Sequence, residues 1–308
     1  MIERAAVAVS RSAPYPACVT RIVCSLATAS LALLLAGCKT GGTDPTAAEL
    51  RANDEPGPSK VEPERPPLVT VELALVDDAA RERLAARLGP GSSLAGAEAL
   101  VAVRHQIEPG WHIYWKNPGE TGLRTRLTVE AEHAEAGETL YPAPERFASE
   151  GGQQSYGWGE TAVLFVPLSE LGEGAQIELR SNYLACAQSC IPGESEVGAR
   201  VAELAQASDA ATVEMLARVP EPANARVASS WIDGALHLRP SAEDLQLTEL
   251  FPYATETAIL GNQDRTGDDL VLHYRFTGAP PAGAQGVLRA TLAGQTRWLE
   301  LAVPWPPA

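Results

Sequence analysis

Residues 176–197 read QIELRSNYLACAQSCIPGESEV and combine a strand-like run, two cysteines and a turn-rich exit. The alternate positions before the first cysteine have strand character: Ile177, Leu179, Ser181 and Tyr183. Beyond the second cysteine, Ile191-Pro192-Gly193 brings in turn formers. We therefore expect the chain to run in along one strand, turn, and leave again.

The two cysteines decide how sharp that turn must be. Beyond residue 38, Cys186 and Cys190 are the only cysteines in the chain. A disulfide needs Cα atoms about 4.4–6.8 Å apart, whereas four residues of straight strand span about 13 Å. The pair is therefore expected at the tip or neck of a β-hairpin. Such a small ring stabilises a fold by only about 2 kcal/mol, but its sulfurs are able to exchange with a visiting thiol through a mixed disulfide.

Two other uses of the cysteine pair stay open from the residues alone. It is compatible with an inert bridge that pins the hairpin, and with two thiolates that capture Cu(I) together with a histidine from elsewhere. His105, His112 and His133 are the histidines of this half of the chain, and none lies near the pair in sequence. Zinc is disfavoured because only two thiolates are available. We expect no bound metal and no cofactor.

Short strand-like runs recur on both sides of the hairpin, and turn formers such as Pro109-Gly110 separate them. In the first half they are 69–75, 99–106, 126–131, 162–167, 176–184 and 197–204. In the second half they are 226–239, 256–261, 270–277, 285–292 and 296–303. Two helices are expected, one at 77–88 between Asp77 or Asp78 and Gly89-Pro90, and one at 208–218.

The helix at 208–218 divides the two sets of strands. Its apolar side is expected to carry Val213, Leu216 and Ala217, and Pro220 and Pro222 end it. Many short strands with dense turns predict an all-β fold of two immunoglobulin-like β-sandwich domains joined by a short helical segment. The predicted boundaries are 68–204 for the first domain, 205–222 for the helical linker and 223–308 for the second domain.

The N-terminal part resembles an export signal. Basic residues precede an uncharged stretch from Ile22 to Ala36, which is too short to span a bilayer but suits a signal peptide. Leu35-Ala36-Gly37-Cys38 is similar to a bacterial lipobox, so we predict a signal peptide at 1–37 and lipidation of Cys38. Residues 38–67, rich in Pro, Gly and charge, are predicted to be a disordered tether.

Composition narrows the class of partner. The formal net charge of the 308-residue chain is -15, which argues against nucleic-acid binding because neutralising phosphates needs clustered Lys and Arg. We expect a protein of the periplasm, lipid-anchored to the cell envelope. Lys39 after the lipobox cysteine slightly favours the outer membrane.

Three ordered segments resemble a known family. They are WHIYWKNPGETG at 111–122, YPAPERF at 141–147, and YLAC at 183–186 followed by CIP at 190–192. All three are similar to the N-terminal domain of the thiol:disulfide interchange protein DsbD, in the variant seen in suppressor-of-copper-sensitivity B proteins. The resemblance implies an immunoglobulin-like domain that carries electrons in the bacterial periplasm.

The resemblance also assigns roles to residues. Cys186 and Cys190 fall at the family's redox pair, and the second of them is expected to form the intermolecular bond. The family shields its thiols with an aromatic residue on a cap loop, for which Phe147 is the candidate and Tyr156 and Trp158 are rivals. The cluster of Trp111, Tyr114 and Trp115 is interpreted as packing, and Asn117-Pro118-Gly119 as a tight turn.

Partners follow from the same resemblance. This sequence contains neither the family's membrane-embedded segment nor its thioredoxin-like domain, so the electron donor is expected to be a thioredoxin-like or membrane protein on a separate chain. Expected clients are periplasmic disulfide isomerases and cytochrome c maturation factors. No Lys or His lies near the cysteines in sequence, and Glu194 and Glu196 make the surroundings acidic. Exchange is therefore expected to depend more on the partner's geometry than on an activated thiol.

Overall fold

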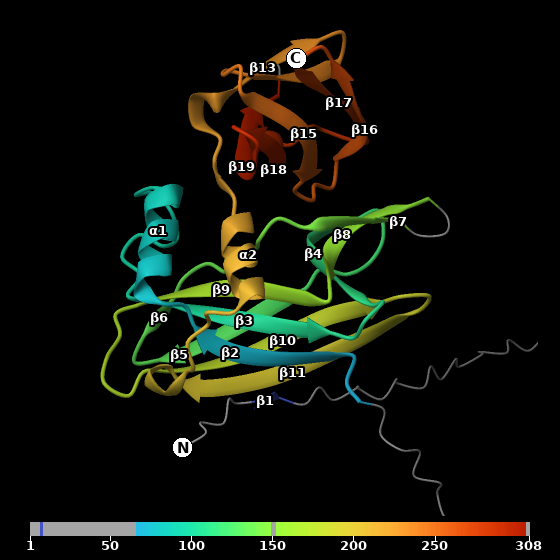
Figure 1. The fold of residues 1–308 in the computed structure, drawn as a ribbon. Coiled ribbons are helices and arrows are strands. Elements are labelled where there is room, and N and C mark those ends of the chain that lie inside the picture. Colours follow the sequence, from blue (N-terminus) through green and yellow to red (C-terminus); the bar gives the residue numbers. More distant parts are fainter. Residues whose placement is uncertain (1–6, 9–65, 149–151, 306–308) are drawn as a thin grey trace, which may run out of the picture. The chain divides into compact units, whose positions relative to one another are not determined.

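The computed structural model describes residues 7–8, 66–148 and 152–305 (Figure 1). The predicted signal peptide, the lipidation site Cys38 and the tether lie outside the described residues, apart from 7–8 and 66–67. Among the residues that are described, no helix has the length and apolar character needed to cross a membrane.

The first module, defined here as residues 66–200 together with the two-residue strand at 7–8, contains two sheets. One has the strand order β1-β2-β3-β9-β6, and the other has the order β11-β10-β4-β8-β7, with β5 also paired to β10. The strands are β1 (Val7–Ala8), β2 (Val69–Leu75), β3 (Ala99–Ile107), β4 (His112–Gly119), β5 (Arg126–Glu132), β6 (Glu135–Ala136), β7 (Glu145–Ala148), β8 (Gln154–Gly159), β9 (Thr161–Ser169), β10 (Gln176–Cys186) and β11 (Cys190–Arg200).

The second module, residues 221–305, also contains two sheets. Their strand orders are β12-β19-β18-β15 and β13-β14-β17-β16. The strands are β12 (Glu221–Pro222), β13 (Val227–Ile232), β14 (Ala235–Pro240), β15 (Leu245–Pro252), β16 (Ala258–Thr266), β17 (Asp269–Phe276), β18 (Gly283–Leu292) and β19 (Gln295–Pro304). The predicted fold class is confirmed: the protein is all-β, with two immunoglobulin-like sandwiches joined by a short helical segment. Where one domain ends and the next begins stays a prediction.

Two α-helices lie side by side next to the first module (Figure 1). They are α1 (Asp78–Leu88) and α2 (Ala210–Arg218), and short 3-10 turns occupy Val201–Glu203 and Asn224–Arg226. The carboxylate of Asp77 accepts a hydrogen bond from the Ala80 backbone N–H and starts α1, as predicted. Arg87 donates to the carbonyl oxygens of Leu216 and Ala217, which joins the C-terminal ends of the two helices.

The core of the first module forms where β3 and β9 are covered on both faces. Nearly every residue of these strands is buried, which explains why they read as continuous apolar runs. Trp115, Trp158 and Phe165 are the largest of the fully buried side chains. Phe251 and Val287 of the second module belong to the same apolar cluster, so the two modules share part of one core.

Three local expectations were wrong. Val213 is 58% exposed, and α2 instead buries Thr212, Met215 and Arg218, because the face turned to β9 is set by tertiary packing. The predicted strand 226–239 is a hairpin, β13 and β14, with its turn at Asp233-Gly234. The predicted strand 197–204 is the end of β11 followed by a 3-10 turn.

A further correction concerns Asn117-Pro118-Gly119, which is not a free tight turn. These residues form the end of β4, where the pairing with β8 shifts register. Asn117 is buried, and its Nδ2 donates to the carbonyl oxygen of Pro252 at 2.7 Å. Strands β4, β7, β8 and β15 were not expected from the sequence, and they hold the residues around the disulfide and at the contact with the second module.

A buried histidine makes the stability of this fold depend on pH. His105 on β3 is 0% exposed, its Nε2 lies 2.7 Å from Ser181 Oγ, and burial lowers its pKa to about 4. Between the unfolded value of about 6.5 and this folded value, only the unfolded chain binds the proton. The stability of the fold therefore does not suffer from burial of this imidazole above about pH 6.5. As the pH falls towards 4, protonation favours the unfolded chain and the free energy of unfolding decreases.

We predict that the free energy of unfolding, measured by urea denaturation, falls with decreasing pH in this window by up to about 1.4 kcal/mol per pH unit. His105→Gln should flatten this slope, whatever it does to the absolute stability. The matched control is His273→Gln, because the side chain of His273 is 51% exposed. An unchanged slope in the His105 variant would show that burial of this imidazole is not responsible.

Candidate functional site

The cysteine pair closes the end of the hairpin formed by β10 and β11. The two strands pair in continuous register from Gln176 opposite Arg200 to Cys186 opposite Cys190. The chain reverses over residues 187–189, where the Ala187 N–H donates to the carbonyl oxygen of Ser189. Cys186 and Cys190 form a disulfide with their Cα atoms 4.1 Å apart. The predicted position of the pair at a hairpin tip is confirmed.

The two sulfurs have different surroundings because their strands have different neighbours. β10 lies between β11 and β4, whereas β11 is the edge strand of its sheet. Cys186 pairs with His112 of β4 on its other side and is 2% exposed. Cys190, on the edge strand, is exposed. The fold therefore leaves Cys190 open to solvent and covers Cys186.

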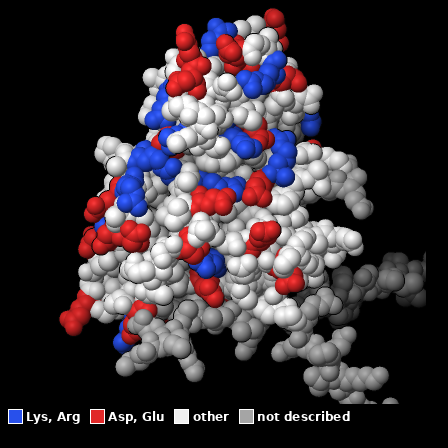
Figure 2. Space-filling model, viewed as in Figure 1, with Lys and Arg blue, Asp and Glu red and all other residues white. Residues whose placement is uncertain are grey.

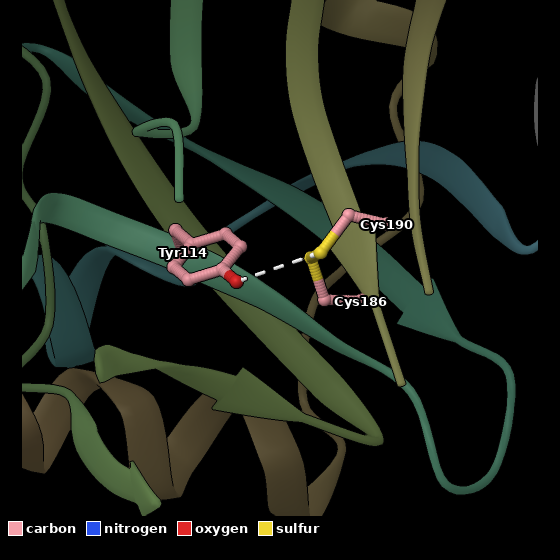
Figure 3. Close-up of a disulfide and its surroundings, with 3 residues drawn as sticks. All are labelled: Tyr114, Cys186 and Cys190. Carbon is pink, nitrogen blue, oxygen red and sulfur yellow. Dashed lines mark hydrogen bonds between the residues drawn. A yellow bond between two sulfur atoms is a disulfide. The ribbon is translucent and has the colours of Figure 1, made fainter. Parts of the chain in front are cut away.

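Tyr114 contacts the disulfide directly. Its hydroxyl lies 4.0 Å from Cys190 Sγ, and Figure 3 shows the phenol ring of Tyr114 directing its oxygen at the sulfur pair. Burial raises the pKa of Tyr114, so the O–H stays protonated near neutral pH and is able to donate towards the sulfur. Sequence analysis assigned this residue to packing alone. The two-residue spacing of His112 and Tyr114 would have predicted that both side chains lie on the same face of a strand.

His112 lies beside the pair in space although it is distant in sequence. Its ring stacks on Phe147 with centroids 4.4 Å apart and an interplanar angle of 10°, and it meets Tyr114 edge-on at 5.1 Å. Burial lowers the pKa of His112, so the imidazole is neutral at pH 7. The chain thus does bring a histidine next to Cys186, but one without the positive charge that would stabilise a thiolate.

The three aromatic candidates for the cap have different environments. Phe147 lies on β7 and contacts His112, the residue opposite Cys186. Trp158 is fully buried and its Nε1 donates to the carbonyl oxygen of Ala143 at 3.3 Å, while Tyr156 packs edge-on against Phe251 of the second module. Of the three, Phe147 is therefore the one that contacts the residue paired with Cys186.

The acidic residues of the hairpin are paired along its outer face. Glu194 accepts a hydrogen bond from Asn182 Nδ2, and Glu196 forms an ion pair of 2.6 Å with Arg180. Glu194 is four strand residues from Cys190, a span of about 13 Å. The negative charge of these carboxylates therefore affects the cysteine pair less than their closeness in sequence suggested.

The remaining signature residues of β4 face the second module. The ring of Trp115 lies 5.7 Å from that of Tyr253, and Lys116 Nζ lies 3.7 Å from the centre of the Tyr253 ring. Asn117 donates to Pro252 O, as described above. One strand therefore connects the disulfide, through His112 and Tyr114, to the second module.

The histidines considered for metal capture are not brought together. His105 is in the core, His133 adopts a positive φ of 53°, and only His112 lies beside the cysteines. Within residues 66–148 and 152–305, no three His, Cys, Asp or Glu side chains are grouped so as to hold a metal ion.

Comparison with known proteins shows what the first module is similar to. No curated protein sequence matches the chain significantly. The family model described as "Thiol:disulfide interchange protein DsbD, N-terminal" matches residues 87–201. Among solved structures, the N-terminal periplasmic domain of ScsB from Proteus mirabilis has a similar fold, with a TM-score of 0.56 and 15% identity over 80% of this chain and 96% of that chain. The resemblance stated above is confirmed for residues 87–201, which match the model of the DsbD N-terminal domain.

Proposed function

We propose that the protein carries out thiol–disulfide exchange in the periplasm through Cys186 and Cys190. Reducing equivalents arrive from a thioredoxin-like or membrane-linked donor on a separate chain and pass to client proteins. The observation that carries this proposal is the unequal exposure of the two sulfurs. Within a disulfide at the end of a hairpin, Cys190 is open to a partner and Cys186 is 2% exposed.

Reduction of the pair proceeds by two thiol–disulfide exchanges. A thiolate of the donor attacks Cys190 Sγ, the Cys186–Cys190 bond breaks, and Cys186 leaves as a thiolate that takes up a proton. The second thiol of the donor then attacks the mixed disulfide, which releases Cys190 as a thiolate and leaves the donor oxidised. The hydroxyl of Tyr114, 4.0 Å from Cys190 Sγ, is placed to donate to that thiolate.

Delivery to a client runs the same chemistry in the opposite direction. The Cys190 thiolate attacks a client disulfide, and Cys186 resolves the mixed disulfide, so that the client gains two electrons and the original bond re-forms. Because burial lowers the pKa of His112, this imidazole is neutral at pH 7 and supplies no positive charge to stabilise a thiolate of the pair. The rate therefore depends on how closely a partner seats its own sulfur against Cys190.

The proposed location is the periplasm, as for the similar ScsB domain. The lipobox at Cys38 would anchor the chain to the cell envelope, and Lys39 favours the outer membrane. A tether of about 29 residues would reach at most about 100 Å from the lipid. The proposed clients are disulfide isomerases and cytochrome c maturation factors.

Cu(I) binding is the alternative function, and one observation favours it. His112 lies opposite Cys186, and its buried Nε2 has no hydrogen-bond partner in the structure. Thiolates are the soft ligands that Cu(I) prefers, and an imidazole nitrogen also suits copper, although in the oxidised form that the structure describes the three groups do not form a metal site. Submicromolar affinity in competition with a Cu(I) chelator, lost in the Cys186→Ser/Cys190→Ser double variant, would favour copper binding over exchange.

We predict that Cys186→Ser traps partners and Cys190→Ser does not. In Cys186→Ser the exposed Cys190 forms a mixed disulfide that has no internal thiol to resolve it. Trapped complexes from periplasm are measured on non-reducing gels and identified by mass spectrometry. Equal trapping by the two variants would contradict the assigned roles. If neither variant traps a partner and both only lower the melting temperature, the disulfide is structural.

We also predict that Phe147→Ala speeds reduction of the disulfide by dithiothreitol. A stacked aromatic pair contributes about 1 kcal/mol, so its loss should raise the rate about fivefold if the ring shields the sulfurs. Phe276→Ala is the matched control, because Phe276 is a 43% exposed aromatic residue of the second module. The rate is followed by quenching with acid and alkylating the free thiols. Equal rates for the two variants would remove the shielding role.

A further inference from the structure

The segment that connects β4 to β5 folds over the surface beside the disulfide. Both strands pair with the same side of β10, β4 opposite Cys186 and β5 from Asn182 onwards. The connecting residues 120–125 therefore leave and re-enter the sheet next to the cysteine hairpin. The N–H of Thr125 donates to the carbonyl oxygen of Tyr114 at 3.2 Å, which closes the base of this segment.

The segment lies on the face of the sheet that carries the disulfide. His112 is opposite Cys186, so Tyr114, two residues along β4, has its side chain on the same face. Gly122 has a φ of +101°, and a Cβ atom on it would come within 2.3 Å of the Tyr114 ring. The hydroxyl of that ring is 4.0 Å from Cys190 Sγ (Figure 3). One phenol ring therefore spans the distance between Gly122 and the exposed cysteine.

Both ends of the segment are anchored in the sheet. The Glu120 N–H donates to the carbonyl oxygen of Gln154 at 2.9 Å, and the Glu120 carboxylate accepts from the Gln154 N–H at 2.6 Å. At the other end, Thr125 is 0% exposed, and the hydroxyl of Tyr141 donates to its carbonyl oxygen at 3.2 Å. The residues between these anchors are therefore held in a defined position beside the hairpin.

Leu123 follows Gly122 and is open to solvent. In residues 66–148 and 152–305, five large apolar side chains are exposed, and Leu123 is the most exposed of them at 65%. A second apolar contribution comes from the cysteine hairpin itself. Leu184 and Pro192 are opposite each other, two residues from the cysteines and on the same face, with Leu184 half-buried and Pro192 exposed. Apolar side chains therefore border the exposed sulfur along its own hairpin and on the β4–β5 segment.

The chemistry of exchange brings a protein partner against these residues. In a mixed disulfide the two cysteine Cα atoms are about 4.4–6.8 Å apart, so a protein joined to Cys190 places its backbone next to the β4–β5 segment. A small thiol such as dithiothreitol reaches the sulfur without covering that segment. On the face seen in Figure 2, Lys and Arg side chains lie among Asp and Glu side chains, and such mixed charge gives a partner little direction. Apolar contact is therefore the better basis for recognition.

We propose that Leu123 determines specificity for a protein donor: it is the apolar contact that seats a thioredoxin-like partner while the partner's thiol reacts at Cys190. The partner is one with an apolar surface beside its own reactive cysteine, because Leu123 and Pro192 are then buried together in the contact. Leu123 acts on the seating of the partner and not on the disulfide bond. The inference rests on the proposed function and adds the residue by which a protein thiol is distinguished from a small one.

The test compares reduction of the disulfide in the oxidised full chain by a reduced single-domain thioredoxin and by dithiothreitol. Free thiols are alkylated after an acid quench. Leu123→Ser should lower the second-order rate constant for thioredoxin about tenfold, which corresponds to about 1.4 kcal/mol, because an apolar side chain is no longer buried in the contact. The rate constant for dithiothreitol should not change. Leu123→Met keeps an apolar side chain of similar size and should recover most of the rate with thioredoxin.

Val213→Ser is the matched control, because Val213 is 58% exposed and lies on α2, which packs on β9 of the other sheet. It should leave both rate constants unchanged. Equal thioredoxin rates for Leu123→Ser and Val213→Ser would overturn the inference, and so would an equal slowing with both reductants, which would place the effect at the disulfide. If thioredoxin reduces the wild-type chain no faster than dithiothreitol at the same thiol concentration, the proposed exchange function is contradicted. Acceleration in the wild type without an effect of Leu123→Ser contradicts only the specificity role.

Discussion

The pairing of Cys186 with Cys190 across the last rung of a hairpin is the constraint on which the rest of the site depends. Sheet topology then makes the two sulfurs unequal, because β10 has a neighbour on each side and β11 has only one. No activating charge is needed for this asymmetry. The open edge of the sheet leaves Cys190 exposed, while β4 covers Cys186. In the proposed exchange, strand order rather than side-chain charge would therefore decide which sulfur a partner meets.

β4 connects the surroundings of the disulfide with the second module. Its first residues, His112 and Tyr114, surround the sulfurs, and its last ones contact Pro252 and Tyr253 of the second module. A continuous signature segment in the sequence therefore serves two sites in the structure. β4 pairs with both β10 and β8, so it lies between the cysteine hairpin and the hairpin that carries Phe147.

Local periodicity and turn chemistry were sufficient to predict much of this fold. The hairpin, its terminal disulfide and the limits of α1 follow from alternation, cysteine spacing and the Asp77 cap, all of which are local signals. Properties set by distant packing were not predictable in this way. Val213 is exposed because other residues of α2 meet β9, and Asn117 is buried because Pro252 offers it a partner 135 residues away. The same limit applies to His112, which only strand pairing brings to Cys186.

The interface between the modules combines two kinds of contact that behave differently. Phe251 and Val287 enter the core of the first module, and such apolar burial is costly to undo. Arg146 and Glu249 instead meet beside a cavity, where water and a competing charged group are able to replace either partner. The β7–β8 hairpin therefore meets the second module through an apolar contact on β8 and a charged one on β7. The charged contact lies on the same short strand as Phe147, which stacks on His112 opposite Cys186, so one strand links the second module to the surroundings of the disulfide.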